Sequence, residues 1–134
     1  MAEYIFRHRI GNRGGWTSKS AGTWASYGSP ASQHAQEALT EWELDLSPHR
    51  SQPIEEELVA ESGLIAVMTA QHQMEVMRQF PEAGDRVRLL TSFGTGNGAP
   101  DISDPIGMSL HVYRHVRDQI DSAMADLIIH IMES

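Results

Sequence analysis

Residues 101–132 read DISDPIGMSLHVYRHVRDQIDSAMADLIIHIM and divide into a short loop followed by a long helix. The loop places Asp104 directly before a proline, and a glycine follows two residues after that proline. A carboxylate in such a loop acts as a general acid if it faces a cleft. It also serves simply as a turn or capping residue, because Asp-Pro commonly opens a turn. Both interpretations of Asp104 stay open from this stretch alone.

The second part of the stretch predicts the longest helix of the chain, from Ser109 to about Met132. Apolar residues recur there at spacings of three and four, which places them on one face of a helix. These residues are Leu110, Tyr113, Val116, Ile120, Ala123, Met124, Leu127, Ile128 and Ile131. We therefore expect this face to be packed against the core.

Four further helices are expected, at residues 2–13, 32–44, 55–61 and 70–80. In the second of them Ser32 is placed to cap the first turn. In the last, Met74, Met77 and Phe80 are expected to face inward, because methionine at helical spacing is usually core filler.

Short strands are expected between the helices, at residues 16–21, 64–68 and 86–90. Residues 64–68 form a continuous apolar run, as expected for a parallel strand that is buried on both faces. Strands separated by helices imply a parallel sheet with right-handed crossovers. The predicted fold is therefore α/β, a three-layer sandwich with a short parallel sheet, and residues 1–134 are expected to form one domain.

The composition excludes several classes of function. The formal net charge is −8, from 18 acidic against 10 basic residues, which argues against nucleic acid as a general partner. There is no cysteine, so these residues contain no disulfide, thiolate metal site or cysteine nucleophile. No apolar run reaches the roughly 18 residues of a membrane span, and no signal-peptide pattern is present. We expect a cytoplasmic protein without a membrane partner or a cofactor.

Other patterns favour ordinary structural roles. The glycine-rich residues 94–98 lack the strand–loop–helix context and the Gly-Lys-Ser/Thr ending of a P-loop, and indicate a surface loop. His111 and His115 share a helix face, but no third ligand completes a zinc site, so no metal is expected. No Gly-x-Ser-x-Gly nucleophile motif occurs. Arg50 can bind an anion, but an ion pair with the acidic residues 55–57 is the favoured interpretation.

Five segments, taken in order, carry a resemblance to a known family. They are residues 1–6 (MAEYIF), 20–23 (SAGT), 49–53 (HRSQP), 67–72 (VMTAQH) and 104–113 (DPIGMSLHVY). Their order and spacing resemble the low-molecular-weight protein tyrosine phosphatases, particularly the bacterial branch that includes protein-arginine phosphatases. The resemblance runs through nearly the whole chain and implies the fold of phosphotyrosine protein phosphatase I.

The resemblance also implies roles for individual residues. In the family a Cys-x5-Arg-Ser/Thr loop joins the first strand to the first helix. Its thiolate attacks phosphorus, its arginine and backbone N–H groups hold the phosphate, and an aspartate protonates the leaving oxygen. Here Asp104 corresponds to that acid, with Asp101 as the alternative. Ser20 and His49 are assigned to structural support of the loop.

Neither the loop nor the strand before it occurs in this sequence, and the helix that begins at Met1 has no N-cap residue. We therefore expect an N-terminally shortened family member that is inactive as given. Its full form would act on phosphotyrosine or phosphoarginine proteins. The alternative is a genuine short member that acts as a binding or regulatory module. Without its first strand, the sheet is expected either to close up or to form a homodimer through its exposed edges.

Overall fold

A computed structural model describes the chain except for residues 12, 14, 23–25, 95–99 and 134. Its elements, in chain order, are α1 (Ala2–Ile10), α2 (Gln33–Thr40), α3 (Glu56–Glu61), β1 (Ile65–Val67), α4 (Ala70–Gln79), the 3₁₀ segment η1 (Pro81–Arg86), β2 (Val87–Leu89), the 3₁₀ segment η2 (Leu90–Phe93) and α5 (Leu110–Met132). β1 and β2 pair in parallel, with Ile65 opposite Val87. The predicted α/β fold with a short parallel sheet is confirmed.

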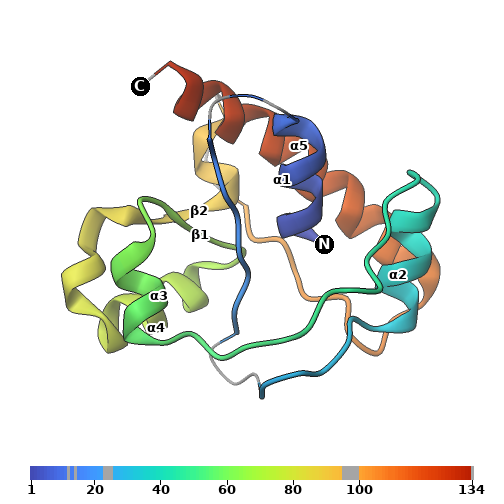
Figure 1. The fold of residues 1–134 in the computed structure, drawn as a ribbon, viewed down its shortest axis with the longest axis horizontal. Helices are drawn as coiled ribbons and strands as arrows, with labels where there is room; N and C mark the ends of the chain where they lie inside the picture. Colours follow the sequence, from blue (N-terminus) through green and yellow to red (C-terminus); the bar gives the residue numbers. More distant parts are fainter. Residues whose placement is uncertain (12, 14, 23–25, 95–99, 134) are drawn as a thin grey trace.

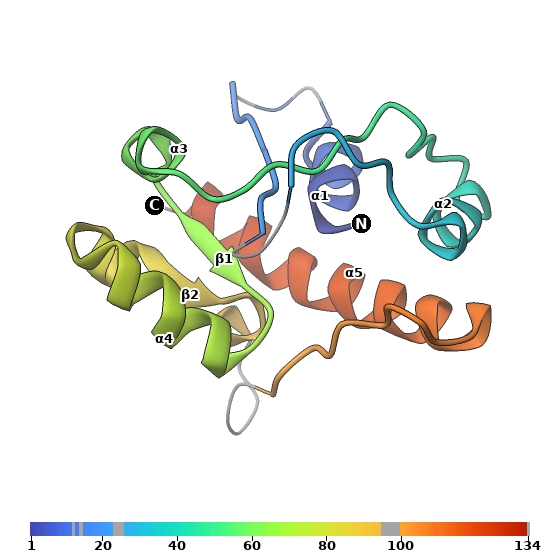
Figure 2. The same ribbon diagram turned by 90° about the horizontal axis from the view of Figure 1, so that it is seen from below.

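The elements form three layers, with the sheet between two groups of helices (Figure 2). On one side α1, α2 and α5 enclose the larger apolar cluster, in which Ile5, Leu39 and Ile120 are buried. On the other side α3 and α4 enclose a smaller cluster. The smaller cluster consists of Val59, Val67, Val76, Ala83 and Val87. The two clusters together hold the sheet in place from both faces.

Helix α5 matches its sequence prediction closely and supports the larger cluster along its whole length (Figure 1). Eight of its expected apolar residues, from Tyr113 to Ile131, are buried, and Leu110 is half-buried. Its first turn is capped by Ser109, whose hydroxyl accepts from the N–H of Val112 at 3.4 Å.

Within the described part of the chain, no helix is both long and apolar enough to cross a membrane.

Two strand predictions are wrong in extent. Residues 16–21 are not in a strand, and only Gly22 forms a single parallel bridge, with Pro53. Residues 64–68 are not buried on both faces, since Ala66 is exposed and the strand is limited to β1. Both errors have one cause, because the described sheet has two strands and neither segment has neighbours on both edges.

The inward face of α4 also differs from the prediction. Met74 and Met77 are 72% and 40% exposed, whereas Val76 is buried. The side-chain amide of Gln73 donates to the carbonyl of Val87 in β2 at 3.0 Å, and this contact turns the face of Gln73 and Val76 towards the sheet. Phe80 is half-buried against the smaller cluster, as expected.

A buried arginine joins α2 to α5. The side chain of Arg117 is 9% exposed, and its guanidinium donates to the carbonyl of Ala38 at 2.8 Å and to Glu41 at 2.7 Å. It also stacks over the ring of Trp42, 4.3 Å from the ring centre. A buried charge of this kind stabilises a fold only while its partners are kept.

We predict that Arg117→Ala lowers the free energy of unfolding by about 2–4 kcal/mol, because it leaves a buried carbonyl unpaired and removes a cation–π contact. Arg114→Ala is the matched control. Arg114 pairs with the same Glu41 but is 44% exposed, so solvent weakens its ion pair and its loss should destabilise the fold much less than the loss of Arg117. Urea denaturation measures both, and equal losses would show that Arg117 does not act as a buried link.

Candidate functional site

The segment that carries the two candidate acids, residues 100–109, is anchored at the end of β1. Ile102 is buried, and its N–H donates to the carbonyl of Met68 at 2.8 Å. Next to it, the carboxylate of Asp101 accepts from the N–H of Ala70 at 2.9 Å, at the start of α4. A carboxylate at a helix N-terminus accepts a hydrogen bond from a free N–H group, and its negative charge interacts favourably with the positive end of the helix dipole. Asp101 is thus engaged as a cap of α4.

Asp104 lies in a different setting. It is exposed, and one of its carboxylate oxygens accepts from the N–H of Ile106 at 3.0 Å within a tight turn. The turn continues with the N–H of Met108 donating to the carbonyl of Pro105 at 2.9 Å, and Gly107 has φ +78°. An exposed carboxylate on a short, well-defined turn is available for proton transfer to a bound molecule.

A second cluster lies at the first turn of α1, around Glu3. The side chain of Glu3 is only 11% exposed and forms an ion pair with Arg7. It accepts from the hydroxyl of Ser20 at 2.6 Å, and His49 Nδ1 lies 3.7 Å from the same carboxylate oxygen. Ser20 and His49, predicted as a supporting pair, therefore meet at one carboxylate. Glu3 was not among the predicted site residues, and the sequence signal for it was its i, i+4 spacing to Arg7.

Further bonds join the same three segments. The hydroxyl of Ser18 donates to the carbonyl of Glu3 at 3.2 Å, and the side chain of Gln52 donates to the carbonyl of Ser20 at 2.9 Å. The rings of Tyr4 and His49 meet edge to face at 6.0 Å. The start of α1 is therefore tied to residues 18–20 and to residues 49–52.

Burial lowers the pKa of His49 below its ordinary value, and Glu3 opposes this effect. The positive charges of the α-amino group, Arg7 and Arg50 add to the lowering. Burial also lowers the pKa of the Met1 α-amino group, again against the influence of Glu3. The Glu3 cluster is thus a packed, partly desolvated site in which a neutral imidazole is favoured.

The expected pairing of Arg50 with the acidic residues 55–57 is wrong. One guanidinium nitrogen of Arg50 donates instead to the carbonyls of Ser47 and His49, at 2.8 and 2.7 Å. Both acceptors belong to the same turn as Arg50, so these hydrogen bonds fix the conformation of that turn and do not link it to a distant segment.

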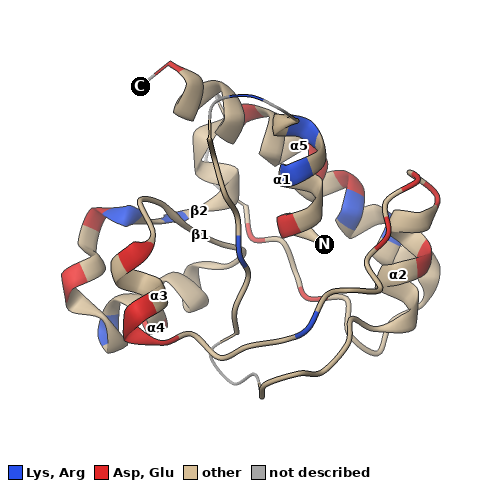
Figure 3. Ribbon diagram, in the orientation of Figure 1, with Lys and Arg blue, Asp and Glu red and all other residues tan. Residues whose placement is uncertain are grey.

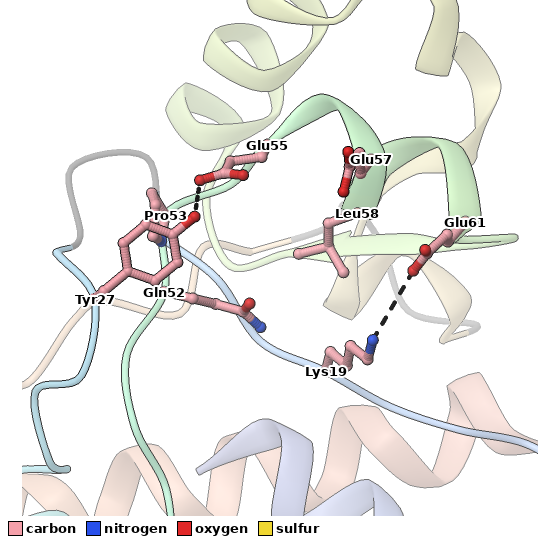
Figure 4. Close-up of a pocket in the computed structure, with 8 residues that line it drawn as sticks. All are labelled: Lys19, Tyr27, Gln52, Pro53, Glu55, Glu57, Leu58 and Glu61. Carbon is pink, nitrogen blue, oxygen red and sulfur yellow. Dashed lines mark hydrogen bonds and ion pairs between the residues drawn. The ribbon is translucent and has the colours of Figure 1, made fainter.

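The described surface has two hollows of a size to consider for phosphate, and both are lined by carboxylates. The first is lined by Lys19, Tyr27, Gln52, Pro53, Glu55, Glu57, Leu58 and Glu61 (Figure 4). Its one lysine is 3.9 Å from Glu61, and the hydroxyl of Tyr27 donates to Glu55. Figure 3 shows acidic residues gathered on α3 beside this hollow, whereas basic residues lie on α1. Carboxylates in such numbers repel a phosphate dianion.

The second hollow lies between α5 and the segment of residues 100–102, and it is acidic as well. Its charged lining includes Asp101, Asp118 and Asp126, together with His115. His111 and His115 are both exposed, and the described residues contain no group of three or more potential metal ligands. Of the predicted glycine loop at 94–98, only Gly94 lies within the described residues. Neither hollow offers an anion site.

A family model described as low molecular weight phosphotyrosine protein phosphatase matches residues 1–134. The chain belongs to this family. It is 36% identical over 129 residues to a protein-arginine-phosphatase of Bacillus subtilis (strain 168), covering 95% of this chain and 84% of that relative. A protein-arginine-phosphatase of Geobacillus stearothermophilus is 36% identical over 104 residues, covering 78% of this chain and 69% of the relative.

Solved structures agree with this assignment. YwlE arginine phosphatase from Geobacillus stearothermophilus superposes with a TM-score of 0.90 at 31% identity, over 98% of this chain and 83% of that one. A cysteine-to-serine variant of YwlE, with a phosphorylated active-site serine, gives 0.92 at 33% identity, over 99% of this chain and 87% of that one. The family member described here has no cysteine among its 134 residues.

We predict that His49 makes the stability of the chain depend on pH. Because its pKa is lowered in the folded state, the unfolded chain binds the proton first as the pH falls. The contribution is therefore present above about pH 6.5 and is lost as the pH falls through the folded-state pKa. Denaturation of the wild type and of His49→Gln from pH 7.5 to 5 should show the flatter profile for the variant.

Titration of the His49 ring by NMR provides the internal check on this prediction. Its midpoint should lie below the ordinary histidine value of about 6.5. A midpoint above that value would show that the attraction of Glu3 exceeds the effect of burial, and equal pH profiles for the two proteins would show that the two effects cancel.

Proposed function

We propose that this chain is the acid-bearing part of a phosphoprotein phosphatase domain and that phosphoarginine proteins are its substrate class. The 36% identity to a protein-arginine-phosphatase across 95% of the chain carries the proposal. Phosphotyrosine is the second candidate, supported by a low molecular weight protein tyrosine phosphatase from T. tengcongensis at 34% identity and a TM-score of 0.88.

Asp104 is the proposed general acid. In the reaction that the family resemblance implies, a cysteine thiolate attacks phosphorus and the bond from phosphorus to the arginine nitrogen breaks. Asp104 gives its proton to that nitrogen, or to the phenolic oxygen of tyrosine, so that the leaving group departs neutral. The resulting carboxylate then accepts a proton from the water that hydrolyses the phosphocysteine. Asp101 is the weaker candidate, because its carboxylate caps α4.

Glu3, Ser20 and His49 are proposed as positioning residues. They fix the first turn of α1, and the N-terminus of a helix attracts phosphate through its free N–H groups and its dipole. Their role is to hold this end of the helix in place for a loop that carries the nucleophile. They do not themselves contact the reacting atoms.

We predict that residues 1–134 alone do not hydrolyse p-nitrophenyl phosphate above background, because they contain no thiolate to form the covalent intermediate. Asp104→Ala should have the same rate as the wild type. Turnover in the wild type that is lost in Asp104→Ala would overturn the proposal that a cysteine from outside this sequence is required.

We also predict that a working enzyme results when the N-terminal residues of the Bacillus subtilis relative, which the family resemblance implies hold a strand and a Cys-x5-Arg loop, are fused ahead of Met1. In that fusion Asp104→Asn should lower kcat by about 10²–10⁴-fold, the usual contribution of a general acid. Asp101→Asn is the matched control and should leave kcat nearly unchanged, because the amide oxygen of asparagine can still accept from the N–H of Ala70. Replacement of the loop cysteine by serine should abolish turnover.

The fusion also tests the alternative of a non-catalytic binding or regulatory module. A folded fusion that hydrolyses neither phosphoarginine nor phosphotyrosine proteins would favour that alternative. A larger fall in kcat for Asp101→Asn than for Asp104→Asn would reverse the two assignments.

A further inference from the structure

The hollow between α5 and the segment of residues 100–102 is a groove with a mainly apolar surface. In Figure 2 the orange segment that leads into α5 runs alongside this helix. The floor of the groove consists of Pro100, Ile102 and Ala123, and the last two belong to the larger cluster. The volume of the groove is about 580 Å³, within the range of ligand pockets in proteins. It is therefore large enough to hold a few residues of another chain.

The charges on the walls of this groove are negative, and its lining contains no lysine or arginine. Asp118 and Asp126 stand on α5, and Asp101 stands on the opposite wall. One carboxylate oxygen of Asp118 accepts from Nε of Arg117 at 3.0 Å, but the side chain remains 59% exposed. Within the described residues, the carboxylate of Asp126 has no hydrogen bond or ion pair. The groove therefore attracts a cationic occupant.

The spacing of the two carboxylates on α5 indicates the shape of that occupant. Asp118 and Asp126 are eight residues apart, which corresponds to about 12 Å along a helix. In an extended chain, residues i and i+4 are about 13 Å apart, and side chains i, i+2 and i+4 lie on one face. Two cations four residues apart would thus reach both carboxylates. The residue midway between the two cations would face Ala123 on the apolar floor.

We propose that this groove docks an extended segment of a substrate protein with the pattern Arg-x-apolar-x-Arg, in which both arginines are unphosphorylated. Arginine fits better than lysine, because its planar guanidinium binds carboxylates through two hydrogen bonds and is less strongly hydrated. The proposal rests on the proposed function and names the sequence that surrounds the phosphoarginine. Asp101 on the groove wall precedes Asp104 by three residues, so the docked segment lies near the turn of the candidate acid.

A second copy of this chain is a poorer occupant of the groove. The chain carries a formal net charge of −8, so two copies repel each other. Its only two basic residues at a spacing of four are Arg9 and Arg13, and the residue midway between them is Gly11, which offers no apolar side chain. Arg9 is already engaged, since its guanidinium donates to Asp121 at 2.6 and 2.9 Å.

The test measures binding of the fluorescein-labelled peptide Ala-Arg-Ala-Leu-Ala-Arg-Ala to residues 1–134 by fluorescence anisotropy. Asp126→Asn should raise Kd by about threefold to fivefold, the size expected for one partly exposed ion pair. Ser122→Arg should raise Kd by about tenfold or more, because this exposed residue of α5 lines the groove between the two carboxylates. Asp85→Asn is the matched control. It removes the same charge from an exposed position on η1 and should leave Kd unchanged.

The peptide Ala-Arg-Arg-Leu-Ala-Ala-Ala has the same composition but the wrong spacing and should bind more weakly. Equal binding of the two peptides, or equal effects of Asp126→Asn and Asp85→Asn, would overturn the proposal and indicate general attraction to an acidic protein. Equal or tighter binding of the probe with lysines in place of arginines would also overturn it. So would the absence of binding, in favour of a second copy if light scattering shows a dimer that Ser122→Arg dissociates. The peptides are unphosphorylated, so failure of the fused enzyme to hydrolyse phosphoarginine proteins would leave this result unaffected.

Discussion

Burial of the apolar face of α5 is the constraint on which the other elements depend. That face contributes eight of the 17 buried residues of the larger cluster, and α1 and α2 pack against it. Arg117 adds a polar link from the same helix to the carbonyl of Ala38 in α2. Since the segment with Asp104 leads directly into the cap of α5 at Ser109, the position of this helix also fixes where the candidate acid can lie.

The two candidate functional clusters come from opposite ends of the chain and show different physical chemistry. Asp104 is an exposed carboxylate on a turn, whereas Glu3 is nearly buried and shared by Ser20, His49 and Arg7. The first is suited to proton transfer and the second to holding backbone in place. The two hollows described above are acidic, so phosphate binding would depend on backbone N–H groups and an added arginine.

Much of the fold was predictable from local pattern. The helical spacing of apolar residues predicted α5 and its buried face, and the alternation of helices and short apolar runs predicted a parallel sheet. The prediction of a strand at residues 16–21 failed because a strand exists only through its neighbours. The orientation of Met74 and Met77 failed because a contact from Gln73 to β2, remote in sequence, sets the rotation of α4.

The sequence by itself determined the family, through the order of five short segments, and excluded a cysteine nucleophile through composition. It also identified Asp104 and Asp101 but did not separate them. Only the tertiary structure assigned Asp101 to the cap of α4, made Glu3 the centre of a cluster, and left Ala66 exposed in β1. These outcomes depend on which distant backbone and side-chain groups meet, and periodicity along one segment carries no information about such contacts.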